Sequence, residues 1–180
     1  MILEFDSFYL DKIQPKDSWK LCNFAVANED RLKRYFPKTL EANLTPTLAE
    51  FFTIKKVKQF ANREEFLFIL KHTQTRDVAG MIYIKELDWN KKQGEFAYCI
   101  GYPFEGQGLT TKVVKALSQY AFDVLGLESL QIIVHKDNIA SVKVAINTTF
   151  KWIKTLPEAY TPPNETPLDM ELYELYKNDL

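Results

Sequence analysis

The sequence contains little that would build a metal centre, a disulfide scaffold or a membrane span. It has two cysteines and two histidines among 180 residues, and neither type shows the spacing of a metal-ligand motif. No stretch approaches the 18 or so consecutive apolar residues that a membrane-spanning helix requires. Residues 1–12 lack the basic and then apolar stretches of a signal peptide. We therefore expect a cytoplasmic protein with two reduced thiols, no metal and no membrane contact.

Neither sign of charge is in excess. There are 23 basic and 24 acidic residues, for a formal net charge of −1. No global field attracts the protein to nucleic acid or to anionic lipid, so any polyanion must be held by a local site. The hydrophobic fraction of 46% and the length predict one domain, residues 1–180, with a sizeable core.

Two patterns of apolar residues, one typical of strands and one typical of helices, divide the chain. Apolar and β-branched runs predict strands at residues 2–10, 65–72, 78–87, 94–101, 130–134, 150–156 and 170–176, with a helix as the less favoured alternative for 170–176. Helical spacing and start signals predict helices at residues 15–28, 29–37, 46–60, 109–125 and 138–147. Residues 157–167 are rich in proline and predict a loop or hairpin connection.

The order of these elements indicates the fold class. Three consecutive strands predict an antiparallel meander, and strand–helix–strand passages predict parallel strands joined by right-handed crossovers. The result is an α/β, or layered α+β, domain in which helices flank a mixed, mostly antiparallel central sheet.

The segment that carries chemistry is a glycine-containing loop between a strand and a helix, Glu105–Thr111 (EGQGLTT). Gly106 and Gly108 have no side chains that block the backbone, so the amides of residues 106–111 are free to face an anion such as pyrophosphate. An ordinary turn that needs glycine conformations explains the same residues. A nucleotide-binding loop is less well supported, because no lysine follows the second glycine.

Several segments together resemble the GNAT acetyltransferase superfamily, in the branch of the Rim-type ribosomal-protein N-terminal acetyltransferases. Glu105–Thr110 lies on the loop pattern Gln/Arg-x-x-Gly-x-Gly/Ala. Gly94–Ile100 (GEFAYCI) resembles the preceding strand, and Asn138–Phe150 (NIASVKVAINTTF) resembles the motif NxASxRVLEKLGF. The resemblance is dense over residues 77–155 and looser towards both ends.

The resemblance implies that acetyl-coenzyme A lies in a gap where the strand at residues 95–101 splays from its parallel neighbour at residues 130–134. The pantetheine would pair with the backbone of the first strand, and the pyrophosphate would lie on the loop. The implied cofactor-binding residues are Ala97, Tyr98, Cys99, Ile100, Gly106, Gln107, Gly108, Leu109, Thr110, Thr111, Asn138 and Ser141.

The resemblance also implies direct acyl transfer from the thioester to a neutral amine. Glu95 matches the family's recurrent glutamate and is the candidate base, acting through water. A backbone amide near Tyr98 or Cys99 would stabilise the oxyanion. The tyrosine that often protonates the leaving sulfur is replaced by Ala145, so Ser141 is the candidate donor, although a serine there also fits a helix cap. Candidate residues for the acceptor side are Arg31, Tyr35, Phe36, Tyr83, Trp89 and Tyr173, each of which also fits ordinary packing.

Three departures from the family pattern leave an alternative open. Glu105 places a carboxylate near the expected pyrophosphate, Thr110 replaces a small residue, and Thr149 replaces a glycine. A catalytically inactive module that binds coenzyme A or a partner protein as a regulator therefore stays an alternative. The acceptor is a peptide N-terminus, an antibiotic, a polyamine or another small amine; a homodimer is a further expectation, because family members often dimerise.

Overall fold

The computed structural model describes residues 1–179, and these form eight strands and six α-helices. The helices are α1 (Ser18–Ala27), α2 (Glu29–Tyr35), α3 (Pro37–Glu41), α4 (Pro46–Ala61), α5 (Leu109–Tyr120) and α6 (Ile139–Asn147). The strands are β1 (Leu3–Phe5), β2 (Phe8–Lys12), β3 (Phe66–His72), β4 (Val78–Asp88), β5 (Gln93–Ile100), β6 (Ser129–Val134), β7 (Lys151–Tyr160) and β8 (Leu168–Tyr176).

The strands form one sheet in the hydrogen-bonding order β1-β2-β3-β4-β5-β6-β8-β7. Strands β5 and β6 are parallel and are joined through α5, as the crossover argument predicts. The pairs β1–β2, β2–β3, β6–β8 and β8–β7 are antiparallel. The predicted mixed, mostly antiparallel sheet with flanking helices is therefore confirmed. The chain divides into two compact parts: Met1–Tyr83 with Tyr98–Gln107, and Ile84–Ala97 with the residues from Gly108 onward.

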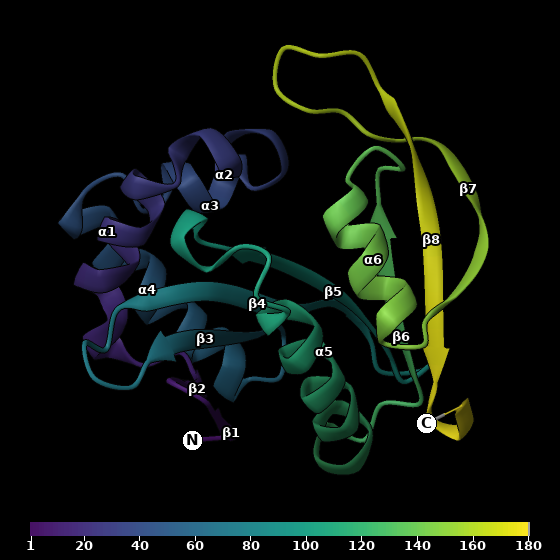
Figure 1. Cartoon of the computed structure of the whole chain (residues 1–180), viewed down its shortest axis with the longest axis horizontal. Helices are drawn as coiled ribbons and strands as arrows, with labels where there is room; N and C mark the ends of the chain where they lie inside the picture. The colour runs from purple at the N-terminus through teal and green to yellow at the C-terminus, as the bar shows by residue number, and fades with distance from the viewer. Residues whose placement is uncertain (180) are drawn as a thin grey trace. The chain divides into compact units, whose positions relative to one another are not determined.

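In the first part, α1 to α4 gather beside β2 and β3 (Figure 1). Strand β3 is buried along almost its whole length, and its aromatic side chains pack against α4. The ring of Phe60 lies edge-on to the rings of Phe66 and Phe68, at centroid distances of 5.0 and 5.3 Å. Helix α4 begins where the sequence predicts it, because the Thr45 hydroxyl accepts a hydrogen bond from the Leu48 amide and Pro46 opens the first turn.

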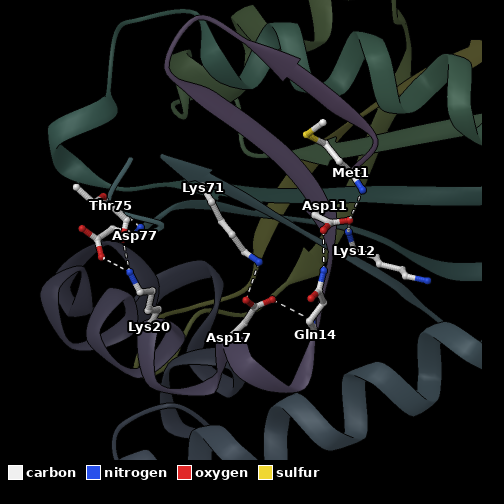
Figure 2. A network of polar contacts seen from close by, with 9 residues as sticks. All are labelled: Met1, Asp11, Lys12, Gln14, Asp17, Lys20, Lys71, Thr75 and Asp77. Atoms are coloured by element: carbon white, nitrogen blue, oxygen red, sulfur yellow. Dashed lines mark hydrogen bonds and ion pairs between the residues drawn. The ribbon is translucent and has the colours of Figure 1, made fainter. Parts of the chain in front are cut away.

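A buried ion pair ties the start of α1 to β3. Lys71 Nζ lies 2.6 Å from Asp17 Oδ1, with the two side chains only 3% and 6% exposed. Asp17 Oδ2 accepts a hydrogen bond from the Gln14 amide at 2.9 Å. Figure 2 shows Lys71 and Gln14 approaching Asp17 from different sides. Both oxygens of a buried carboxylate are thereby satisfied, which fixes the entry of the chain into α1.

In the second part, α5 and α6 lie beside β6, with β8 and then β7 beyond it (Figure 1). Val113, Val114 and Leu117 give α5 a fully buried apolar face, at the three- and four-residue spacing that the sequence shows. The rings of Phe96 and Phe150 are tilted against each other at 6.2 Å. Residues Ala121–Leu125 continue α5 as a π-helical turn, and Gly126 ends it with a φ of +78°.

Three boundary predictions are wrong. Residues 2–10 form the hairpin β1–β2 and not one strand, because Asp6 takes a left-handed φ of +51° and turns the chain. Pro37 opens α3 where the prediction made it end a helix. Strand β7 continues through Pro157 to Tyr160, because register shifts beyond Leu156 accommodate a proline that cannot donate to the ladder.

Candidate active site

The glycine loop forms an exposed turn directly before α5. A 3₁₀ turn at Tyr102–Phe104 leads into it, and Gly106 and Gly108 take φ values of +72° and +70°. A Cβ added at either glycine would meet no atom within 4 Å. The glycines are therefore needed for their backbone conformation and leave the loop open to an approaching ligand.

Helix α5 presents backbone amides to this loop. Its first helical hydrogen bond runs from the Lys112 amide to the Gly108 carbonyl, at 3.1 Å. No side chain caps the helix, and no acidic residue lies in its first turn. The amides of Leu109, Thr110 and Thr111 precede that first bond, so they are the donors that a helix leaves for an anion. The Leu109 side chain is itself buried in the core, so any contact with a ligand would come from its backbone. The Gln107 amide group donates to the Pro103 carbonyl within the loop.

Strand β5 shares only part of its length with β6. The parallel register joins Gln93–Phe96 to Ser129–Ile132, while β5 continues to Ile100 and β6 to Val134. The residues expected to meet pantetheine, Ala97–Ile100, lie beyond the end of this register. Among them, burial raises the pKa of the Cys99 thiol to about 12. This thiol stays protonated at neutral pH and does not compete as a nucleophile.

Glu95, the candidate base, is held by a cation. Its Oε1 lies 2.9 Å from Lys85 Nζ, and its side chain is 16% exposed. Strand β5 places Glu95 next to Phe96, which faces the core. A general base must be within reach of the proton that it takes, directly or through one water. The ion pair fixes the position of the carboxylate without removing it from solvent.

The start of α6 is built as a cap. The Asn138 side chain accepts a hydrogen bond from the Ser141 amide at 3.3 Å, so Asn138 is the N-cap of the helix. Ser141 is half-buried in the first turn, and Ala145 is fully buried one turn further on. Thr149 follows the helix with a left-handed φ of +66°, so it occupies a backbone conformation that favours the family's glycine.

Four candidate acceptor residues lie in the first part of the structure. Phe36 and Tyr83 are stacked at a centroid distance of 6.3 Å, and the Tyr83 hydroxyl shares a hydrogen bond with the Thr39 hydroxyl at 3.1 Å. Tyr83 is buried, and burial raises the pKa of its hydroxyl. The ring of Tyr35 lies under the guanidinium of Arg34. Arg31 contacts the glycine loop through Glu105, at 2.5 Å.

The other two acceptor candidates belong to the second part. Trp89 is exposed at the turn between β4 and β5. Tyr173 is buried in β8, where it pairs with Ile132 of β6 and with Trp152 of β7. The structure therefore stacks Phe36 on Tyr83 within the first part and places Trp89 at a turn and Tyr173 inside β8 within the second.

Tyr83 has a polar neighbour that the sequence pattern did not reveal. The run Lys55–Lys58 has the pattern of a solvated helix face, and Lys55 and Lys58 are exposed. Lys56 is not: its ammonium pairs with Glu65 at 2.5 Å and lies 5.4 Å from the centre of the Tyr83 ring. Helical spacing alone places Lys56 next to buried Phe52 and Thr53, which is the signal that would have identified it.

Within residues 1–179 there is no cluster of three or more His, Cys, Asp or Glu side chains able to hold a metal ion. In the same part of the chain, no helix combines the length and the apolar character needed to cross a bilayer.

Comparisons with known proteins agree with this architecture. The model of the acetyltransferase (GNAT) domain matches residues 8–151. YdaF of Bacillus subtilis (strain 168), named provisionally as a ribosomal N-acetyltransferase, is 27% identical over 67% of this chain, and the match spans 64% of YdaF. The ribosomal-protein-S5-alanine acetyltransferase of Vibrio fischeri has the same fold, with a TM-score of 0.91, 18% identity and coverage of 98% and 97% of the two chains. RimL, a ribosomal L7/L12 N-acetyltransferase crystallised with coenzyme A, has a TM-score of 0.89, 15% identity and 99% coverage of both chains. The chain belongs to the GNAT acetyltransferase family.

Proposed function

We propose that this protein transfers the acetyl group of acetyl-coenzyme A to a primary amine, with residues 1–180 acting as one catalytic domain. The observation that carries the proposal is the open turn at Gly106 and Gly108, followed by the uncapped amides of α5. Backbone donors of this kind fit a pyrophosphate, and the helix dipole adds to the attraction. RimL, which shares the fold, was crystallised with coenzyme A.

The residues that would hold the coenzyme are those of two continuous segments. The loop and first turn of α5, residues 106–111, would bind the pyrophosphate. The end of β5, Ala97–Ile100, would pair with the pantetheine amides, which is supported by a β5–β6 register that ends at Phe96. Bound acetyl-coenzyme A supplies the thioester carbonyl that the amine attacks. Asn138 and Ser141 would contact the thiol end from the start of α6.

Three chemical tasks then fall to the protein. Glu95 would accept the proton of the amine through a water molecule. A backbone amide near Tyr98 or Cys99 would stabilise the developing oxyanion. Ser141 would donate a proton to the leaving sulfur, for which its place in the first turn of α6 is the support.

For the acceptor we propose the N-terminus of a protein. The support is that YdaF, RimL and the Vibrio fischeri enzyme are all named for ribosomal proteins. The side chains expected to meet it are Tyr35, Phe36 and Tyr83 in the first part and Trp89 and Tyr173 in the second. Arg31, the remaining candidate from the sequence, is engaged with Ile100 and Glu105. The cytoplasmic location and the homodimer stay predictions.

Calorimetric titration with acetyl-coenzyme A, free coenzyme A and ATP tests the cofactor. We expect saturable binding of both coenzyme forms and none of ATP. An acceptor screen with N-terminal peptides, polyamines and small amines then tests turnover. Glu95→Gln should lower kcat and leave coenzyme binding unchanged. Glu128→Gln is the matched control, because Glu128 forms a similar but exposed pair with Lys92. Coenzyme binding without turnover on any amine would favour the regulatory module.

A further inference from the structure

Arg31 makes three contacts with the segment that leads into the glycine loop. Its Nη1 donates a hydrogen bond to the Ile100 carbonyl at 2.9 Å. Its Nη2 lies 2.5 Å from Glu105 Oε2. Its guanidinium lies over the ring of Tyr102, 4.3 Å from the ring centre. One side chain of α2 thus holds the end of β5, the 3₁₀ turn and the first residue of the loop.

A second residue just before α2 holds the same segment. The Asn28 side-chain oxygen accepts a hydrogen bond from the Tyr102 amide at 3.0 Å, and its amide group donates to the Phe24 carbonyl at 2.8 Å. Asn28 is 4% exposed. Because Asn28 is buried and both its side-chain oxygen and its side-chain nitrogen are hydrogen-bonded, it sets the position of α2 relative to Tyr102. Arg31, one turn further on, is then placed to reach Glu105.

The pairing resolves the charge problem that Glu105 raises. An unpaired carboxylate beside a pyrophosphate site would repel the ligand. The Arg31 side chain is 23% exposed and that of Glu105 is 53% exposed, so the pair lies near the surface and solvent screens it in part. Arg31 and Glu105 together carry no net charge, so the pairing offsets the repulsion that the carboxylate alone would exert on an anion.

The Nε donor of Arg31 is also informative. Its Nε is buried and has no hydrogen-bond partner among residues 1–179. Leaving a buried donor unmet is costly, so the other contacts must hold the side chain in this orientation. An arginine that served only as a surface charge would turn to place Nε in water.

We propose that Arg31 is a positioning residue for the coenzyme: its ion pair with Glu105 neutralises that carboxylate and holds the glycine loop in the shape that accepts pyrophosphate. This rests on the proposed function, in which the loop binds acetyl-coenzyme A. The chain thereby replaces the family's cation or amide at position 105 with a carboxylate plus a cation from α2. Arg31 acts through Glu105 and not on the reacting atoms.

Charge reversal tests the proposal. The variants are Arg31→Glu, Glu105→Arg and the double exchange, with Lys38→Glu as a control that makes the same charge change at an exposed position of α3. We expect each single reversal to weaken coenzyme A binding about tenfold or more, and the double exchange to recover most of it. Lys38→Glu should bind as the wild type does. The milder pair Arg31→Gln and Glu105→Gln repeats the test if a reversed variant unfolds.

A truncated substrate separates positioning of the loop from other roles. S-acetylpantetheine carries the thioester without the pyrophosphate, so its KM should be the same in wild type and in Arg31→Gln, while the KM for acetyl-coenzyme A rises. Equal losses with both substrates would overturn the proposal, because they would show that Arg31 acts on a part of the site that does not involve the pyrophosphate. Tighter coenzyme binding by Glu105→Arg in the wild-type background would also overturn it, because it would show that the arginine of the family pattern suffices alone.

Different results would refute the proposed function. If wild-type protein binds no coenzyme, or if Gly108→Val leaves binding intact, the loop is not the pyrophosphate site. If Gly108→Val abolishes binding while all Arg31 and Glu105 variants bind as the wild type does, the loop assignment stands and the role of Arg31 is refuted.

Discussion

Replacing Lys71 by methionine should destabilise the protein more than any change to a surface ion pair. Lys71 Nζ is the cation that satisfies Asp17 Oδ1, and both side chains are almost completely buried. Methionine fills most of the lysine volume, so the substitution removes the charge and leaves little cavity. The Asp17 carboxylate would then be buried with one oxygen still accepting from the Gln14 amide and the other unpaired.

The expected size of the loss follows from that geometry. Removing one partner of a buried ion pair costs about 3–5 kcal/mol, because the remaining charge is uncompensated. For a protein of this length, that corresponds to a fall in Tm of about 6–20 °C. The double variant Lys71→Met with Asp17→Leu removes both charges, so it should lose less stability than Lys71→Met alone. Its remaining loss should include about 1 kcal/mol for the hydrogen bond between Asp17 and the Gln14 amide.

Urea unfolding followed by circular dichroism measures the change, provided that the m-value stays constant. Lys20→Met is the control: Lys20 pairs with Asp77 at 2.9 Å, but the two side chains are 34% and 65% exposed. That pair lies in the same view (Figure 2), and its loss should cost less than about 1 kcal/mol. If Lys71→Met is no worse than Lys20→Met, the reasoning from burial is refuted.

Three further predictions concern the site. Gly108→Val should lower the free energy of unfolding by about 1–2 kcal/mol, because a side chain is strained at a φ of +70°, and it should also abolish coenzyme binding. The control is Gly126→Ala, which introduces a similar strain at a φ of +78°: it should lose stability and still bind the coenzyme in calorimetry. Thr149→Gly should raise the free energy of unfolding by about 1 kcal/mol, because a β-branched residue there holds a φ of +66°; no gain in urea unfolding would contradict the strain. Burial raises the pKa of the Cys99 thiol from 9.0 to about 12, so the protonated thiol is favoured in the folded state and stability should decline as pH rises from 9 towards 12; Cys99→Ala should decline less steeply, and an identical pH profile would refute the assignment.

Much of the fold was predictable because its signals are local. The apolar face of α5 repeats at helical spacing, and β6 is a short apolar run between polar turns, so each is recognisable within a dozen residues. The two glycines before α5 were compatible with an anion-binding loop and with a turn that needs glycine conformations, and both have positive φ. The boundaries failed where one residue acts against its usual tendency. Asp6 turns a chain that otherwise has the composition of a strand, and Pro157 lies inside β7.

The polar geometry of the candidate site was not predictable in the same way. The sequence indicated Glu95 and Glu105 as carboxylates in or near the site, but not their partners Lys85 and Arg31. Lys56 belongs to a run of exposed lysines by composition, yet it pairs with Glu65 beside Tyr83. A side chain's charge is fixed by its type, whereas its partner depends on which distant segment the fold brings next to it.

The sequence by itself determined the order of strands and helices, the open glycine turn and membership of a family, because periodicity and backbone preferences act between near neighbours. Only the tertiary structure decided that Arg31 would reach Ile100, 69 residues away along the chain, and that Lys71 would meet Asp17 across 54 residues. Pairing over such separations depends on how the strands and helices pack, and burial then sets how strongly each pair acts.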